Sequence, residues 1–550
     1  MKWTREFIAA LAALCLVGLP ASIALGQVDE GDASVVIESL DLDDPREDEP
    51  ATDLVLNLDQ KDQADRGNTI VVGAIRIEGA TLIPQSLFAP IIEAYMGRSL
   101  APADLRRLAS DIANVARGRG YGLATAWIPG QSSGNGLLRV EIDEGRIHSI
   151  EARGTAADIV GRMLAPLVNG RPVRTAELER RLLLAGDISG VRLGKARLDR
   201  RNGRNVLSIV AGRENVQAEA AADNWGTDAV GPIRARLAVD FNGLVADDDR
   251  LTLGGVVTPL QPKEFYLFQA GYSKAIGTNG AMVHLNGYFA ESNPGAELSR
   301  LELGGRSMEA QIGLSHPFLR TRATSLWGNA FLRVRDSEQD RRDLPLRDDR
   351  ITALTLGAYG VARWPNGRLR TRLTLIQGLD LFGANEAGDL LASRPDADGT
   401  FTKLEYWAEY QHYLGRQFSI QAQIQGQIAS GPLLSSEEMG LGGRYFLRGY
   451  DYRERSGDQG GAGSIELRYD LANLPEPLSM TQFYAFMDGG TVRNSRRGFG
   501  GGSLASLGAG VRGRVAGVDV GLEVGLPLKV RYDPAKRRGP RLSFTLGKYF

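Results

Sequence analysis

The sequence predicts a membrane β-barrel of about 16 antiparallel strands, preceded by two small β-α-α-β-β units. Three observations lead to this fold class. Segments of about ten residues alternate between apolar and polar side chains over residues 215–550. No apolar run in that region is long enough to cross a bilayer as a helix. One order of strands and helices occurs twice over residues 69–214.

The composition excludes several classes of site. The chain has 550 residues, with 65 Lys+Arg against 66 Asp+Glu, 68 Gly and a single Cys. One cysteine rules out a disulfide framework, a Cys-ligated zinc site and a CxxC redox pair. Glycine is well above the roughly 7% of average proteins, which indicates many turns and strands.

Residues 1–26 have the three parts of a secretory signal peptide. A charged start precedes the apolar run Phe7–Val17, and small residues lead to Gly26. The run is shorter than the roughly 20 residues that a membrane helix needs. We expect cleavage after Gly26, which would remove Cys15 and leave no cysteine.

Residues 27–68 form an acidic leader. Over 27–66 it holds 14 acidic and 3 basic residues, whereas the chain from 67 onward carries a net charge of +9. Its two short apolar patches are too small to offset the entropy of ordering, so we expect a disordered or partly helical segment. Pro45 and Pro50 argue against a long helix.

Residues 69–146 and 147–214 are predicted to be two copies of one unit. In the first copy a strand is followed by two helices with apolar residues at helical spacing, and then by two strands. Neither copy gathers ionisable side chains, so both are predicted to be binding modules whose sheet edges accept an extended peptide as an added strand. The elements expected in the second copy are strand 147–152, helices 156–167 and 175–184, and strands 191–198 and 205–211.

Residues 215–550 are predicted to close into a barrel. Alternation is clearest in Ile233–Phe241, Gln417–Ile428 and Val518–Leu526. A soluble β-sandwich also alternates, but its polar face is the exposed one and its connections are shorter; a barrel turns its apolar face to lipid and its polar face to a water-filled lumen. An even strand number places both ends on one side, and sixteen strands enclose a channel. The expected strands start near 217, 231, 249, 264, 280, 305, 323, 351, 368, 400, 417, 461, 481, 503, 516 and 541.

Four short motifs resemble one family. Gly120-Tyr121, Pro129 with Gln131, and Val140–Gly145 (VEIDEG, with Glu144) are similar to the signature of a polypeptide-transport-associated (POTRA) domain. Asp223-Asn224-Trp225-Gly226 resembles the family's first barrel strand. With the predicted architecture, the chain is identified as a member of the TpsB family, the outer-membrane transporters of two-partner secretion (type V secretion; hemolysin secretion/activation), within the BamA-related superfamily.

The most specific motif is Leu447-Arg448-Gly449-Tyr450, in the long connection after the eleventh strand. It resembles the tip of a family loop that folds back into the barrel between about residues 430 and 460. The second motif, Phe486-Met487-Asp488-Gly489-Gly490, resembles a motif on the thirteenth strand whose carboxylate meets the loop arginine.

Physical chemistry favours the same pairing. A guanidinium binds a fixed carboxylate through two parallel hydrogen bonds, and Phe486 and Asp488 have the parity to share one face of their strand. Arg512 and Arg514 also share a face and are candidates for the same cluster. The final strand places Leu542, Phe544, Leu546 and Phe550 outward, and Phe550 is the candidate barrel-assembly signal.

The resemblance implies a pore in the bacterial outer membrane with periplasmic POTRA domains. Its expected partner is a secreted TpsA-type exoprotein such as a hemolysin or adhesin, recognised through its N-terminal secretion domain and exported without ATP. Further expected partners are outer-membrane lipid and, during biogenesis, the barrel assembly machinery, with no nucleic acid. The alternatives are an insertase of the BamA/TamA type and a passive porin or barrel enzyme.

No catalytic constellation is predicted. The four histidines, at 148, 284, 316 and 412, are widely separated and lie in no metal-binding motif. We therefore expect no metal, no cofactor and no enzymatic activity. An acidic leader drawn into a basic lumen is a further hypothesis.

Overall fold

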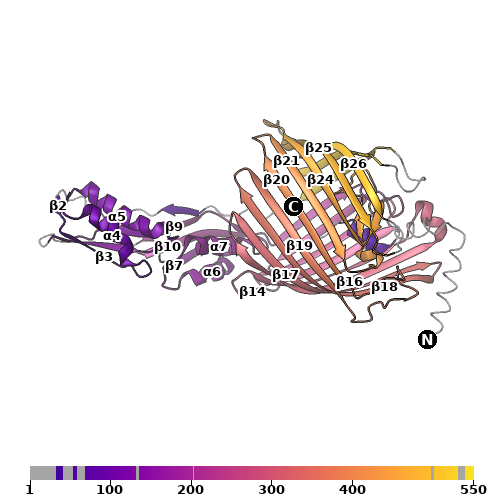
Figure 1. Cartoon of the computed structure of the whole chain (residues 1–550), viewed down its shortest axis with the longest axis horizontal. Coiled ribbons are helices and arrows are strands. Elements are labelled where there is room, and N and C mark those ends of the chain that lie inside the picture. Colours follow the sequence, from indigo (N-terminus) through magenta and orange to yellow (C-terminus); the bar gives the residue numbers. More distant parts are fainter. Residues whose placement is uncertain are drawn as a thin grey trace.

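A computed structural model describes residues 32–40, 54–57, 69–131, 136–201, 204–496, 501–529 and 539–550. The signal-peptide prediction and most of the acidic leader lie outside these ranges. Figure 1 shows a wide barrel with the two small units projecting from one end. No helix in the described ranges is long and apolar enough to cross a membrane.

Sixteen antiparallel strands close the barrel, so the predicted number is confirmed. Each strand pairs with its neighbours along the chain, and the last strand closes on the first. The strands are β11 Val216–Asp223, β12 Arg234–Asn242, β13 Asp249–Val257, β14 Phe265–Ile276, β15 Ala281–Ser292, β16 Leu303–Arg320, β17 Thr324–Arg341, β18 Leu344–Trp364, β19 Gly367–Leu379, β20 Thr402–Tyr413, β21 Phe418–Ala429, β24 Gln459–Asp470, β25 Leu478–Arg493, β26 Gly502–Val515, β27 Val518–Pro527 and β28 Arg541–Tyr549.

The alternation of side chains distinguishes the outer wall from the lumen. On β21, Ile424 and Ile428 are more than half exposed, whereas Gln421 and Gln427 on the opposite face are buried. A soluble sandwich would bury the apolar face, so this pattern fits a barrel that presents it to lipid.

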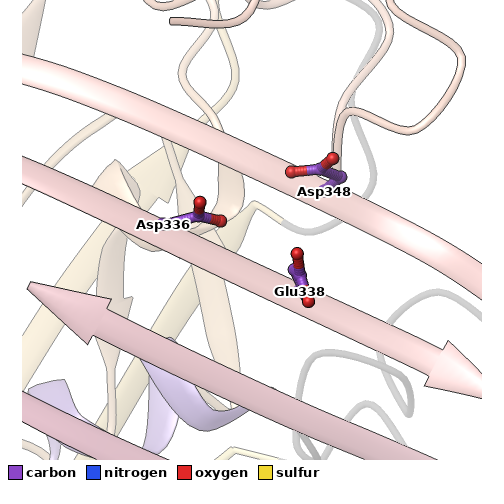
Figure 2. A group of neighbouring side chains, drawn as sticks. All are labelled: Asp336, Glu338 and Asp348. Carbon is purple, nitrogen blue, oxygen red and sulfur yellow. The ribbon is translucent and has the colours of Figure 1, made fainter. Parts of the chain in front are cut away.

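The hairpin of β17 and β18 is longer than expected, because β18 starts at Leu344 rather than near 351. It carries three neighbouring carboxylates, Asp336, Glu338 and Asp348, whose oxygens lie within 4.8 Å of one another (Figure 2). The guanidinium of Arg350 lies 3.3 Å from Asp336 and 3.4 Å from Asp348 and supplies counter-charge.

The first repeat folds around helix α5, Pro102–Arg117, which buries Leu108, Ile112 and Ala116 against a three-stranded sheet of order β3-β6-β5. Parallel pairing of β3 with β6 places the two helices on one face of the sheet. The other elements are β2 Ile70–Val71, β3 Ala74–Glu78, η1 Gln85–Phe88, α4 Ala89–Tyr95, β4 Ser99–Leu100, β5 Thr125–Trp127 and β6 Leu137–Asp143.

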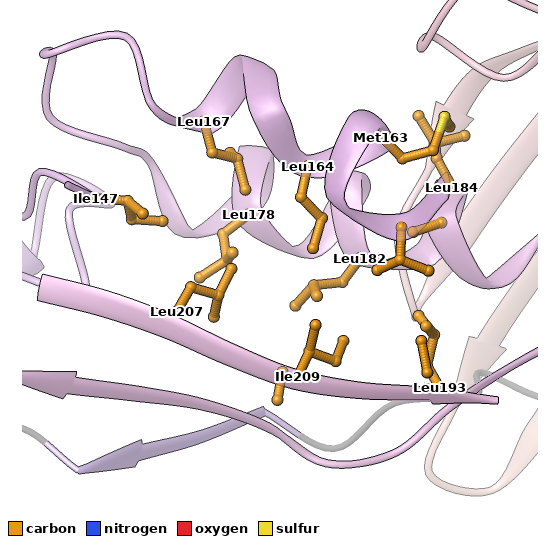
Figure 3. Close-up of a cluster of buried hydrophobic side chains, with 14 of the residues drawn as sticks. Ile147, Met163, Leu164, Leu167, Leu178, Leu182, Leu184, Leu193, Leu207 and Ile209 are labelled. Atoms are coloured by element: carbon orange, nitrogen blue, oxygen red, sulfur yellow. The ribbon is translucent and has the colours of Figure 1, made fainter. Parts of the chain in front are cut away.

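The second repeat has a larger apolar core, in which Leu164, Leu178 and Leu207 are fully buried between the helices and the sheet (Figure 3). The strand expected over 191–198 is wrong as a single element, because the chain breaks at Gly194 and both pieces pair with β10. The elements are β7 Ser149–Arg153, α6 Ala157–Leu164, η2 Ala165–Leu167, α7 Thr175–Gly186, β8 Val191–Leu193, β9 Ala196–Arg201 and β10 Arg204–Arg213.

Two short pieces of the acidic leader are ordered against the rest of the chain. Helix α3, Ala33–Glu38, is capped by Asp32 and packs on barrel residues that include Val256, Phe265 and Leu267. Strand β1, Leu54–Asn57, adds in parallel to the edge of β9 in the second repeat. The described part of the leader thus contains one short helix and one short strand.

The second repeat is docked on the near end of the barrel, the end that faces the repeats. Arg320, at the end of β16, donates two hydrogen bonds to the carboxylate of Asp187, at 2.8 and 2.5 Å, and its guanidinium lies over Trp327. Arg181 adds a 2.7 Å hydrogen bond to the carbonyl oxygen of Thr278. These contacts fix the direction in which the repeats leave the barrel.

Replacing Asp187 with Ala should loosen this junction. The substitution leaves the buried guanidinium of Arg320 without its carboxylate, a loss of about 3–5 kcal/mol for buried pairs. Distances between spin labels on α7 and on β19 should become broadly distributed. The control is Arg162→Ala, which breaks the exposed pair with Asp247 and should leave the distribution narrow. Equal widths in both variants would contradict the docking role of Asp187.

Candidate functional site

The loop between β21 and β24, residues 430–458, folds back into the barrel. It contains a 3₁₀ turn, η4 Ser435–Glu437, and a small hairpin of β22 Met439–Leu441 with β23 Arg455–Gly457. Beyond β22 the chain reaches the tip, Leu447–Tyr450, where all four residues are buried. Leu447 has a φ of 61°, and it packs into a cluster formed by Met439, Leu441, Phe446, Tyr450, Ala462, Val492 and Leu504.

Arg448 and Asp488 form the centre of the site. The guanidinium donates from Nε to Oδ2 at 3.2 Å and from Nη2 to Oδ1 at 3.0 Å, and the backbone amide of Arg448 also donates to Oδ2, at 3.1 Å. The exposed fraction is 7% for Arg448 and 1% for Asp488. A carboxylate that accepts both a bidentate guanidinium and an amide from one residue fixes the side chain and the backbone of the loop tip together.

Two further carboxylates complete the lock, the name used here for the contacts around Arg448. Nη1 donates to Glu466 at 3.0 Å and to Glu523 at 3.2 Å. Glu466 is shared with Arg468 and Arg512 through its other oxygen, at 2.6 and 2.8 Å. Three arginines therefore face three carboxylates, and this balance offsets the cost of holding charges away from bulk water.

The lock occupies three adjacent cross-strand rows on β24 to β27. Each row runs through residues that are direct partners in the ladder, and each contributes contacts to Arg448 or its neighbours. The rows are Ser464, Asp488, Ser506 and Pro527; Glu466, Phe486, Gly508 and Gly525; and Arg468, Tyr484, Gly510 and Glu523.

Aromatic rings and glycines shape the floor of the lock. The guanidinium of Arg448 lies 3.4 Å from the centroid of the Phe486 ring. A Cβ on Gly508 would lie 2.4 Å from Phe486, and a Cβ on Gly525 would lie 2.6 Å from the carbonyl oxygen of Arg448. Gly449 lies against Pro527 with the same lack of space, so glycine is required wherever the loop tip meets the wall.

The remaining motif residues hold the tip from both sides. The Tyr450 hydroxyl donates to the carbonyl oxygen of Ala505 at 2.9 Å and accepts from the amide of Lys529 at 3.0 Å. A Cβ on Gly490 would lie 3.1 Å from the side chain of Leu447. The loop motif and the motif on β25 are therefore in direct contact.

The two other candidate arginines, Arg512 and Arg514, lie in different places. Arg512 joins the cluster through Glu466 and lies 4.7 Å from the centroid of Tyr484. The prediction for Arg514 is wrong: it lies next to the turn that joins β26 to β27 and pairs there with Asp519, at 2.7 and 3.0 Å. Glu466 and Glu523 were not predicted, since no motif marks them and their proximity depends on strand register.

A second ionic network anchors the loop on the opposite wall. Glu437, with 1% of its side chain exposed, pairs with Arg333 at 2.6 Å and with Lys403 at 2.9 Å. Arg394, from the connection 380–401, pairs with Glu438 and Asp458 of the loop, both at 2.7 Å. The loop therefore spans the lumen and is held at both ends by charges.

The leader helix is bound to the same loop. Glu38, at its last position, accepts hydrogen bonds from the hydroxyl of Tyr452 at 3.0 Å and from Arg453 at 3.4 Å. Arg234 on β12 donates to the Ser39 hydroxyl at 2.9 Å. Loop and helix together fill part of the lumen, and both polar contacts and small apolar clusters hold them in place.

The POTRA-like signature residues connect loops within and between the repeats. Glu144 is buried and accepts hydrogen bonds from the Thr81 hydroxyl at 2.5 Å and from the amides of Leu82 and Ile83. Gly145 has a φ of 96°, and its position leaves no room for a Cβ beside Leu123. These residues fix the chain where the first repeat ends.

The other signature residues have comparable local contacts. The carbonyl oxygen of Gly120 accepts the amide of Thr175 at 2.9 Å, and Arg174 lies over the Tyr121 ring, so both tie the first repeat to the second. Gln131 exchanges two hydrogen bonds with the backbone of Arg139. Pro129 lies half-buried after β5.

Known proteins give a consistent result. The model described as "Haemolysin secretion/activation protein ShlB/FhaC/HecB" matches residues 206–513, and a ShlB-type POTRA domain matches 70–145. The heme/hemopexin transporter protein HuxB of Haemophilus influenzae strain 86-028NP is 24% identical over 74% of each chain. The structure of CdiB from Escherichia coli has a TM-score of 0.70 at 21% identity, over 90% of this chain and 93% of that one. BamA from Haemophilus ducreyi, lacking POTRA domains 1–3, has a TM-score of 0.50 at 12% identity, over 88% and 100%.

Replacing Glu144 with Gln should weaken the loop 81–83. Burial alone would raise the pKa of Glu144, but the hydrogen bonds from Thr81, Leu82 and Ile83 outweigh it and hold the pKa below its usual value. Losing the charged acceptor should cost about 1–3 kcal/mol locally. The measurement is amide hydrogen exchange of Leu82 and Ile83 in the full-length protein.

The pH dependence of this contact follows from the sign of the shift. A lowered folded-state pKa stabilises the protein above the ordinary carboxyl pKa of 4.5, and the stabilisation is lost as the pH falls below it. Protection of Leu82 and Ile83, corrected for intrinsic exchange, should therefore fall on acidification in the wild type and change less in Glu144→Gln. Glu141→Gln, on the same strand, is the control, and an equal effect from it would count against the interpretation.

Proposed function

The chain belongs to the haemolysin secretion/activation protein family ShlB/FhaC/HecB, whose members are outer-membrane transporters, and on that premise we propose that it exports one large partner protein through its barrel. The barrel lies in the outer membrane, with the POTRA domains in the periplasm. The near end of the barrel is therefore periplasmic, and the loop 430–458 enters from the extracellular side.

The observation that carries the proposal is a lumen filled by removable elements. Loop 430–458 and helix α3 are held by ion pairs and hydrogen bonds, including those of Arg448, Glu437 and Glu38. Such contacts can be exchanged for water and for a polar chain, whereas an apolar core cannot be opened without a large hydrophobic cost. A lumen closed in this way does not suit passive diffusion through a porin.

Partner recognition is proposed to use strand addition on the POTRA domains. The leader strand β1 already pairs with β9 along Leu54–Asn57, which supports the view that this edge accepts an extended segment. Backbone hydrogen bonds then supply affinity, and side chains on alternate positions supply selectivity. The proposed partner is the N-terminal secretion domain of a TpsA-type exoprotein, presented unfolded.

Export is proposed to proceed without a nucleotide, a cofactor or catalytic chemistry in this chain. The outer membrane has no ATP supply, so direction must come from another irreversible step. Folding of the partner after it leaves the barrel provides one, because a folded chain cannot return through the lumen.

Insertion of the barrel is proposed to use its last strand. Phe550 is 68% exposed, and its backbone exchanges hydrogen bonds with Ala218 on β11. An aromatic residue that closes the ladder and faces lipid is suited to recognition by the barrel assembly machinery, and outer-membrane lipid then covers the apolar wall.

Replacing Arg448 with Ala should abolish secretion while the barrel remains inserted. The variant leaves Asp488, Glu466 and Glu523 without their shared cation, weakening the lock by about 3–5 kcal/mol. Secretion is measured as partner protein in the medium, and insertion as the heat-modifiable band of the folded barrel. Arg514→Ala is the matched control, because Arg514 pairs outside the lock. Normal secretion by Arg448→Ala would refute the proposed role.

Deleting residues 27–66 should raise the ionic conductance of the pore, since α3 and its contacts to Arg453 and Arg234 would be removed. Conductance is measured in planar bilayers at low and high salt. The control is Glu38→Gln, which keeps the segment and removes one charge, so its effect should be smaller. Unchanged conductance and unchanged salt dependence after the deletion would contradict a leader that obstructs the lumen.

A further inference from the structure

The motif Asp223–Gly226 lies at the extracellular end of β11, where the barrel closes on itself. The seam, defined here as the contact of β11 with β28, pairs five residues along its ladder, from Glu219 with Tyr549 to Asp223 with Thr545. Each of the two neighbouring strand pairs has eight. The seam is therefore short for this barrel, and its stability depends more than elsewhere on side chains.

Asn224 extends the seam with its side chain. Its Nδ2 donates to the carbonyl oxygen of Leu542 at 2.9 Å, and its Oδ1 accepts the amide of Phe544 at 2.7 Å. The amide group thus occupies the place of a backbone peptide and adds a step to the ladder. Beyond it the chain turns inward, because the amide of Trp225 donates to Asp223.

Arg541, the first residue of β28, joins the seam to the loop tip. Its guanidinium lies 4.8 Å from the centroid of Trp225 and 3.5 Å from the carbonyl oxygens of Asn224 and Gly226. It also forms an ion pair with Asp451, the residue that follows the buried Tyr450. One guanidinium therefore contacts the first strand, the last strand and the tip of loop 430–458.

We propose that Arg541 is a positioning residue that couples the loop tip to the seam. While Arg448 holds the tip on Asp488, Asp451 orients the guanidinium of Arg541 across Trp225 and the seam stays paired. When the tip leaves, Arg541 loses its ion pair with Asp451, so the seam loosens. The coupling rests on the proposed movement of the loop during export.

The chemistry of the three groups explains why an arginine is required. A guanidinium can stack on an indole and donate in its own plane to a carboxylate and to carbonyl oxygens at once, which an ammonium cannot do. Trp225 is 4% exposed, so its ring offers a fixed surface. The Asp451 carboxylate supplies a strong contact that depends on the loop.

The motif Asp223–Gly226 is also connected to the leader helix, through Arg234. Asp223 accepts Nε of Arg234 at 2.9 Å, and the other end of that guanidinium holds Ser39. The loop tip and the leader helix thus both have connections to the extracellular end of β11, next to the seam.

The test is amide hydrogen exchange of the full-length protein in detergent, followed in peptides covering 216–223 and 541–549. Arg541→Gln and Arg448→Ala should each speed exchange in both peptides by about tenfold, the scale of one charge-assisted hydrogen bond. Peptides from β18 and β19 should not change. Arg514→Gln is the matched control, since it breaks a bidentate pair on a nearby strand outside the seam.

Coupling is measured by combining the two substitutions. In the Arg541→Gln background, Arg448→Ala should add little to the seam exchange, because the connection is already broken. Seam exchange equal to wild type in Arg541→Gln, or fully additive effects in the double variant, would overturn the proposal. Asp451→Asn, which changes only a loop residue, carries the same test if Arg541→Gln fails to give a folded band.

The readout separates this proposal from the export function. Secretion that survives Arg448→Ala would refute the proposed transport role of the lock. The exchange result depends only on whether the position of the loop tip and the pairing of the seam are energetically coupled. Arg541→Lys gives a final check: it keeps the charge, so a purely electrostatic role predicts wild-type exchange, whereas the proposed role predicts faster exchange.

Discussion

A single buried guanidinium sets the constraint on which the extracellular half of the lumen depends. Arg448 needs carboxylates at fixed positions, and Asp488, Glu466 and Glu523 reach it only because β24 to β27 pair in one register. A slip of one residue in any of these strands would turn that strand's members of the three rows toward lipid. Two glycines belong to the same requirement: a larger residue at 525 would push the loop tip off the wall, and one at 508 would displace the Phe486 ring on which Arg448 lies. The register of β24 to β27 therefore sets the position of the loop tip.

Buried ion pairs hold the loop in the lumen beside small apolar clusters, and this has a physical consequence. Ion pairs such as Glu437 with Lys403 have large desolvation costs that offset most of their attraction, so breaking them in a hydrated channel costs less than exposing an equal apolar area. The apolar contacts of the loop form two small clusters, one around Leu447 and Tyr450 and one around Leu433 and Leu434. A plug of this kind is specific in position yet can be displaced by a polar chain.

Sequence reasoning was strongest where the pattern is periodic. Alternation predicted sixteen strands, and the parity of Phe486 and Asp488 predicted a shared face, because both follow from the two-residue repeat of a strand. It failed where the outcome depends on which residues of different strands become neighbours: Glu466 and Glu523 carry no motif, and Arg514 has the parity of Arg512 but lies too near a turn. The seven extra residues at the start of β18 were missed because they extend beyond the alternating segment. The leader helix was hard to foresee, since its order comes from the barrel wall and not from its own six residues.

The leader connects the two ends of the proposed transport path. Helix α3 lies in the lumen against Arg453 and Arg234, and strand β1, a short distance further along the chain, lies on the edge of β9 below the barrel. An edge strand has one free side, so a partner segment that adds to β9 must displace β1. The partner would then compete with a segment that is covalently continuous with the obstruction in the pore. The second repeat is fixed to the barrel through Arg320 and Asp187. A partner segment that binds β9 would therefore displace the leader strand β1 instead of moving the whole repeat.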